Sequence, residues 1–231
     1  MLNEMWWVLM LVLNFVAILF AYRVWGKLGL FIWIPISVIV ANIQVTKNVN
    51  LFGLEATLGN IVYSTSFLAT DILSEMYGPK ESKKAVTIGF FSVIVMTIMM
   101  QLAIQFNPAP SDFVQESMET IFGFMPRIAF GSIIAYVISN FHDIWAFELW
   151  KKLKPGKKTL WMRNCFSTMV SQLLDSLIFT FIAFFGVYEM SVWWQIVLTT
   201  YLLKFIVAVC DTPFMYIARK WFDNNKICEG L

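Results

Sequence analysis

Residues 84–106 read KAVTIGFFSVIVMTIMMQLAIQF, and after Lys84 this stretch contains no Asp, Glu, Lys or Arg. A helix needs ~20 mostly apolar residues to cross the hydrocarbon core of a bilayer, so this stretch is long enough to span it. Six more windows of this kind occur along the chain, at 5–22, 28–46, 57–77, 121–148, 164–188 and 193–221. The sequence predicts an all-α integral membrane protein, a bundle of about seven transmembrane helices.

The composition agrees with a membrane protein. Hydrophobic residues make up 59% of the 231 positions and charged residues 14%, whereas soluble domains carry ~25% charged residues. The segments between windows are short, so we expect one transmembrane domain over 1–231. A net charge of +2 gives no reason to expect a nucleic-acid partner. The three cysteines lack metal-ligand spacing, and we expect no metal and no cofactor.

The positions of Lys and Arg predict the orientation, because these residues accumulate on cytoplasmic loops. With the N-terminus outside and the C-terminus inside, 14 of the 17 cations lie on inner loops: Arg23, Lys27, Lys80, Lys83, Lys84, Lys151, Lys152, Lys154, Lys157, Lys158, Arg163, Arg219, Lys220 and Lys226. Lys47 lies outside, and Arg127 and Lys204 fall within windows. If window 5–22 does not span, a six-helix protein keeps the same orientation downstream.

Four windows carry polar side chains on one helical face. In window 57–77, Asn60, Ser64, Phe67, Asp71 and Glu75 follow a helical spacing. The corresponding faces of the later windows carry Ser132, Tyr136, Ser139 and Asp143; Asn164, Thr168, Ser171, Gln172 and Asp175; and Thr200, Lys204, Val207 and Asp211. A charge in the bilayer core is costly, so such faces turn toward a partner or a hydrated cavity. We expect the four faces to line one polar cavity.

The acids outnumber the cations inside the windows. The windows contain two cations, Arg127 and Lys204, and five acids: Asp71, Glu75, Asp143, Asp175 and Asp211. One interpretation is structural, in which acids and cations pair to hold the bundle together. The acids left over would then bind protons or a ligand that supplies hydrogen-bond donors.

The motifs of common enzymes are missing from the sequence. His142 is the only histidine, and there is no HExxH zinc motif and no glycine-rich phosphate loop. We therefore do not expect an enzyme. No filter-like segment indicates a channel. A membrane receptor or sensor that transports nothing stays open as an alternative.

Several motifs resemble one known family. They are ATDILSEMYGPK at residues 69–80, RIA at 127–129 continuing to Asp143, LWMRN at 160–164, and QLLDS at 172–176. Asn42-Ile43, the loop Leu51-Phe52-Gly53-Leu54, Lys204-Phe205 and Asp211-Thr212-Pro213 fit as well. Over roughly residues 40–215 the chain resembles the queuosine precursor transporters, also called the vitamin uptake transporter family.

This resemblance implies uptake of 7-deazaguanine compounds for tRNA modification: the cyano or aminomethyl precursor, queuine or its nucleoside. Carboxylates accept from the N–H groups of such a base, amides offer donors and acceptors, and aromatic rings stack on it. On this basis the substrate-binding candidates are Asp71, Asp175, Asn60, Asn164, Gln172, Phe67 and Tyr136. The candidates for gating or charge pairing are Glu75, Arg127, Asp143, Arg163, Lys204 and Asp211.

Two transport mechanisms remain open. The protein is either a secondary carrier in the inner (plasma) membrane or the substrate-capture subunit of an ATP-energised uptake system. The expected partners are the small-molecule cargo and the lipid bilayer, with no direct nucleic-acid contact. A homodimer and an energising partner stay open.

Overall fold

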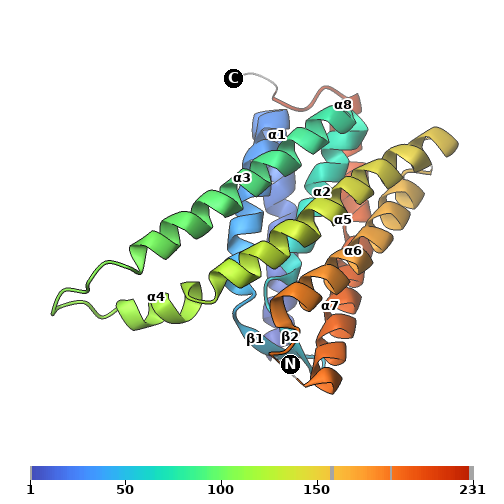
Figure 1. Cartoon of the computed structure of the whole chain (residues 1–231). Coiled ribbons are helices and arrows are strands. Elements are labelled where there is room, and N and C mark those ends of the chain that lie inside the picture. Colours follow the sequence, from blue (N-terminus) through green and yellow to red (C-terminus); the bar gives the residue numbers. More distant parts are fainter. Residues whose placement is uncertain (1, 157–158, 188, 229–231) are drawn as a thin grey trace.

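The computed structural model describes residues 2–156, 159–187 and 189–228, without the side chains of Leu54, Arg163, Asn164 and Val192. The elements are α1 (Leu2–Gln44), β1 (Asn48–Leu51), β2 (Leu54–Thr57), α2 (Asn60–Met76), α3 (Pro79–Ala103), α4 (Gln115–Phe122), α5 (Met125–Leu153), α6 (Leu160–Phe184), α7 (Met190–Cys210) and α8 (Thr212–Asp223) (Figure 1). Apart from one small hairpin, the regular structure is helical, so the predicted all-α class is confirmed.

The first element, α1, consists of two helical segments that meet at Gly26. The backbone of Gly26 (φ 55°, ψ −134°) is not helical, and glycine adopts such a positive φ without steric cost. The segments run antiparallel, since Gln44 Nε2 lies 3.9 Å from Met10 Sδ. They pack closely near the turn, where a Cβ on Gly29 would lie 2.1 Å from the Ala21 carbonyl oxygen. Window 5–22 therefore lies within α1, and window 28–46 lies within it as far as Gln44.

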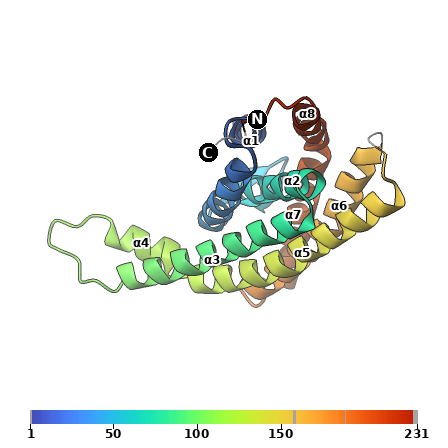
Figure 2. The same cartoon turned by 90° about the horizontal axis from the view of Figure 1, so that it is seen from above.

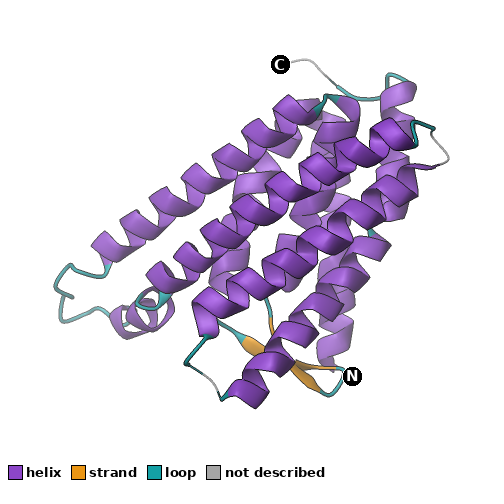
Figure 3. Ribbon diagram, turned by 45° about the vertical axis from the view of Figure 1, so that its right-hand side comes forward, coloured by secondary structure: helices purple, strands orange, loops and turns teal. Residues whose placement is uncertain are grey.

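A two-stranded hairpin follows α1 and was not expected. β1 and β2 pair antiparallel around Phe52 and Gly53, which both have positive φ, 53° and 78°. Two such residues form the type I′ turn that suits a tight hairpin. Thr199 Oγ1 of α7 donates to the Glu55 carbonyl oxygen at 3.3 Å. The hairpin and the N-terminus lie at the same end of the bundle, called here the hairpin end (Figure 3). The opposite end, which carries α8, is called the α8 end.

Helix α2 lies at the centre of the bundle. Every residue from Asn60 to Glu75 is buried, and α2 contacts α1, α3, α5, α6, α7 and α8. Figure 2 shows α2 surrounded by these helices. Because its neighbours shield it from lipid, this helix tolerates many polar residues. Its position brings the polar face predicted for window 57–77 into the interior.

Large apolar side chains cover the outside of the bundle. Phe91, Ile98, Trp145 and Leu198 are examples, each more than half exposed. Such a surface suits lipid and would be unusual on a soluble protein. In the part of the chain that the structure describes, five helical stretches are long and apolar enough to cross a membrane: Leu2–Gln44, Pro79–Ala103, Gln115–Leu153, Leu160–Phe184 and Trp193–Asp223. Of these, Gln115–Leu153 joins α4 to α5, and Trp193–Asp223 joins most of α7 to α8. The chain is a multi-pass membrane protein, and the count of seven crossings stays a prediction.

The last predicted helix needs a correction. The window 193–221 is divided at Asp211, where α7 ends and α8 begins. Pro213 in the first turn of α8 has no N–H to continue the hydrogen-bond ladder of α7. The division places the Asp211 carboxylate, which is fully buried, at a helix junction inside the bundle.

Candidate functional site

A small pocket of about 30 Å³ lies toward the hairpin end of α2. This volume holds about one or two water molecules, so binding of a larger ligand requires the surrounding helices to move apart. Its lining comes from α1 and the turn after it, α2, α5, α6 and α7: Ala41, Asn42, Val45, Gly59, Asn60, Tyr63, Ser132, Asp175, Phe179 and Lys204. The pocket is thus formed where segments far apart in the sequence meet.

Asp175 is the charged centre of this pocket. Its carboxylate pairs with the Lys204 ammonium of α7. It also accepts from Tyr63 Oη at 2.5 Å and from Ser139 Oγ at 3.2 Å. Lys204 Nζ lies 4.8 Å from the centroid of the Tyr63 ring, which is within cation–π range. Side chains from α2, α5, α6 and α7 therefore meet at one carboxylate.

Two amides border the same pocket. Asn60 Nδ2 donates to the Thr57 carbonyl oxygen at 3.0 Å, which fixes the side chain at the start of α2. Asn42 Nδ2 donates to the Val38 carbonyl oxygen at 2.8 Å. Its Oδ1 is buried and has no donor among the described residues. Buried polar atoms are normally hydrogen-bonded, so this oxygen is available to a water molecule or a ligand.

A second acidic cluster lies farther toward the α8 end. Asp71 of α2 lies beside Asp143 of α5, and the two carboxyl groups are within hydrogen-bond reach. Thr168 Oγ1 of α6 donates to Asp71 Oδ2 at 3.3 Å. Asp211, at the α7–α8 junction, is an electrostatic neighbour of Asp71. The structure therefore brings together three acids that the sequence placed on separate helices.

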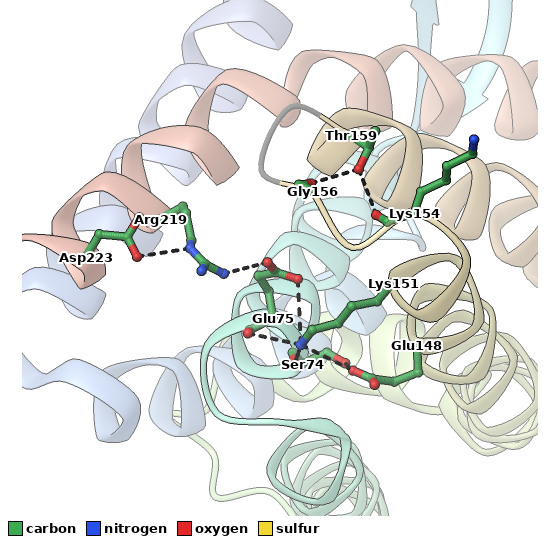
Figure 4. Close-up of polar contacts among 9 residues, drawn as sticks. All are labelled: Ser74, Glu75, Glu148, Lys151, Lys154, Gly156, Thr159, Arg219 and Asp223. Atoms are coloured by element: carbon green, nitrogen blue, oxygen red, sulfur yellow. Dashed lines mark hydrogen bonds and ion pairs between the residues drawn. The ribbon is translucent and has the colours of Figure 1, made fainter.

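A network of ion pairs lies at the α8 end (Figure 4). The Glu75 carboxylate pairs with Arg219 of α8 at 2.5 Å and with Lys151 of α5 at 3.7 Å. Arg219 also bonds Asp223, and Lys151 also pairs with Glu148. The network ties α2, α5 and α8 together beyond the acid cluster.

The remaining predicted residues lie in different surroundings. Phe67 and Tyr136 are fully buried and pack edge-on against Tyr63, with ring centroids 5.9 and 5.8 Å away. Gln172 is fully buried on α6. Arg127 does not reach the acids and donates to the carbonyl oxygens of Ile182 and Phe185 at the end of α6. The predictions for Arg163 and Asn164 fall on side chains outside the described set.

Three important residues were missed in the sequence. Tyr63 lies three residues after Asn60 and four before Phe67, so helical spacing places it on the same face. Lys151 and Arg219 were counted as cations of inner loops, and nothing in their spacing shows that they reach Glu75.

Comparisons with known proteins identify the family. The family described as "Putative vitamin uptake transporter" matches residues 57–218. A Bacillus subtilis (strain 168) protein named "Probable queuosine precursor transporter" is 45% identical over 98% of this chain and 99% of its own length. The Escherichia coli (strain K12) "Queuosine precursor transporter" is 25% identical, covering 81% of this chain and 86% of its own.

A Haemophilus influenzae protein named "Probable queuosine precursor transporter" is 24% identical over 78% of this chain and 74% of its own length. No solved structure matches the chain. The family match covers the segment from the start of α2 into α8. This segment contains most of the pocket lining, including Asp175, and the cluster of Asp71, Asp143 and Asp211. The chain therefore belongs to the vitamin uptake transporter family.

Proposed function

We propose that this protein imports queuosine precursors, 7-deazaguanine bases used in tRNA modification, as a secondary carrier in the inner (plasma) membrane. The observation that carries the proposal is the buried Asp175 at the wall of the interior pocket, in a chain 45% identical to a protein named for this transport. Binding and release of a small polar cargo, without catalysis, is the function that such a pocket supports best.

The pocket matches the chemistry of a deazaguanine base. The base presents ring N–H and exocyclic amine donors beside a carbonyl acceptor. Asp175 and the open Asn42 Oδ1 offer acceptors, and the Lys204 ammonium offers a donor. The rings of Tyr63 and Phe179 supply aromatic surface on which a flat base can stack. Each type of contact in the proposed complex therefore has a residue present in the pocket.

The orientation completes the proposal. With the hairpin end outside, the pocket faces the medium, while the ion-pair network of Glu75, Arg219 and Lys151 closes the α8 end toward the cytoplasm. In this arrangement the network acts as the inner gate. Release of cargo requires that α2, α5 and α8 separate at this network.

The test uses cells that neither make nor import queuosine precursors. The chain is expressed, each candidate base is supplied, and queuosine in tRNA is measured by mass spectrometry. We expect the wild-type chain to restore queuosine. Tyr63→Phe removes a donor to a carboxylate, an interaction of ~1.5–3 kcal/mol, so uptake should fall by about tenfold or more. Asp175→Asn should abolish uptake.

The matched control is Glu116→Gln, which neutralises an exposed acid of α4 and should transport normally. Normal uptake by Asp175→Asn would refute the assignment of the site. If the wild-type chain reaches the membrane and restores no queuosine, either the cargo is wrong or an energising partner is needed. If the purified chain then binds the cargo, the second explanation holds and an energising partner is needed.

A further inference from the structure

The acid pair of Asp71 and Asp143 carries no described positive partner. Asp71 is 1% exposed and Asp143 is fully buried. The described cations on the neighbouring helices are engaged elsewhere, since Lys204 pairs with Asp175 while Lys151 and Arg219 pair with Glu75. Among the described residues, no ion pair joins a Lys or Arg side chain to either member of the acid pair.

The surroundings of the pair are hydroxyl groups and further weak acids. From α6, the hydroxyls of Ser167, Thr168 and Ser171 lie around Asp143. From α5, His142 bonds Ser171 through Nδ1 at 2.9 Å rather than contacting an acid. From the α7–α8 junction, Asp211 adds a third carboxyl group near Asp71, with Cys165 and Cys210 as its neighbours. Each neighbouring helix thus contributes polar or acidic groups, but no described cation.

Two adjacent carboxylates in such a place cannot both carry charge. Burial penalises each ionised form, and the two negative charges repel each other. One proton shared by the pair removes most of this cost and supplies the hydrogen bond between the two carboxyl groups. The form with one shared proton is therefore the one that these surroundings favour.

A second observation points to the same place. Gln172 is fully buried, and neither its Nε2 nor its Oε1 has a partner among the described residues. It lies one helical turn from Thr168, which contacts Asp71, and one turn before Asp175. All three residues therefore project from one face of α6. An unpartnered amide between the two carboxylate sites marks a place for water or cargo.

We infer that the Asp71–Asp143 pair is a proton-binding site, separate from the cargo pocket, through which an inward proton movement drives transport. The inference rests on the proposed function. The pair takes a proton from water on the outer side and releases it to water on the inner side. A proton fits better than a metal ion, because the described residues contain no group of three His, Cys, Asp or Glu side chains able to hold one.

The two sites are joined by the same two helices. Tyr63 and Asp71 are eight residues apart on α2, about 12 Å along the axis, and Thr168 and Asp175 are about 10 Å apart on α6. Tyr63 contacts Asp175, and Asp71 contacts Thr168. A shift of α2 against α6 therefore changes both contacts at once. Loss of the proton from the Asp71–Asp143 pair thereby alters cargo binding in the pocket around Asp175.

The test uses the purified full chain in liposomes with the neutral cyano precursor, labelled, as cargo. Exchange of cargo at equal pH reports binding and movement, and accumulation under an inside-alkaline gradient reports coupling. We expect wild-type protein to do both, and a protonophore to abolish the accumulation. Asp143→Asn and Asp71→Asn mimic the protonated pair, so each should keep exchange while accumulation falls by about tenfold or more.

The controls separate this inference from the proposed function. Glu116→Gln should behave as wild type, and Asp175→Asn should lose exchange as well as accumulation. Absence of exchange by the wild-type protein would overturn the proposed function, and the inference with it. Exchange without a response to the pH gradient, or accumulation driven by a sodium gradient alone, would overturn only the inference. Normal accumulation under the pH gradient in both Asp71→Asn and Asp143→Asn would also overturn only the inference.

Discussion

Asp175 shows how one residue organises the interior. Three side chains from three other helices donate to its carboxylate, and two of them, Tyr63 and Lys204, also contact each other. A buried charge is tolerable only when it is paired and hydrogen-bonded. The same interactions that stabilise Asp175 hold its carboxylate at the pocket wall.

Removing only the cation should therefore harm the fold. Lys204→Met leaves the Asp175 carboxylate without its buried counter-ion, and loss of one partner of such a pair costs ~3–5 kcal/mol. The double variant Lys204→Met/Asp175→Asn removes both charges and should recover much of that stability. Thermal unfolding in detergent measures both effects.

A surface pair provides the comparison. Lys27 and Glu81 pair at 3.2 Å with side chains 45% and 29% exposed, so Lys27→Met should cost less than ~1 kcal/mol. If Lys27→Met and Lys204→Met lower the stability of the protein equally, the buried pair of Lys204 and Asp175 is no more important than a surface pair.

At the scale of elements, the turn of α1 and the centre of the bundle depend on each other. The two segments of α1 pack backbone to backbone beside Gly29, and α1 in turn contacts α2. The central helix can be polar only because such neighbours cover it. The close packing of α1 is therefore part of what keeps Asp71 and Tyr63 away from lipid.

Gly29→Ala should weaken this packing. The new methyl would lie 2.1 Å from the Ala21 carbonyl oxygen, so the two segments must move apart. Overpacking of this kind costs ~1–3 kcal/mol, which would appear as a lower unfolding temperature in detergent. Gly156→Ala is the control, because its nearest neighbour lies 3.8 Å away. Unchanged stability of Gly29→Ala would show that the turn is looser than described.

At the scale of the whole molecule, three polar groups follow one another along the bundle. The proposed cargo pocket lies toward the hairpin end, the acid pair comes next, and the ion-pair network lies at the α8 end. Helix α2 contributes to all three through Tyr63, Asp71 and Glu75. This order suits a carrier that exposes its cargo site to one side of the membrane at a time.

The proposed orientation can be tested with the exposed Cys228 at the C-terminal end. After Cys165 and Cys210 are replaced by Ala, an impermeant maleimide should label Cys228 in inverted vesicles and not in intact cells. In a Cys228→Ser background, Lys47→Cys at the hairpin end should give the reverse pattern. Labelling of Cys228 from outside would contradict the orientation and the direction of the proposed gate.

The sequence by itself determined the membrane class, the approximate helices and the polar faces. The reason is physical: a helix in a bilayer needs an apolar stretch of known length, and helical spacing shows which residues share a face. Residues 84–106 were predicted as a helix, and α3 spans Pro79–Ala103. Asp71 and Asp175 were placed on interior faces for the same reason, and both are buried.

Only the tertiary structure decided which faces meet. Spacing along one helix carries no information about its rotation against another. The pairing of Lys204 with Asp175, the approach of Asp143 to Asp71 and the reach of Arg219 to Glu75 all depend on that rotation. Arg127 shows the same limit, since its apolar window suggested a partner for the acids and the fold directs it to the carbonyl oxygens at the end of α6.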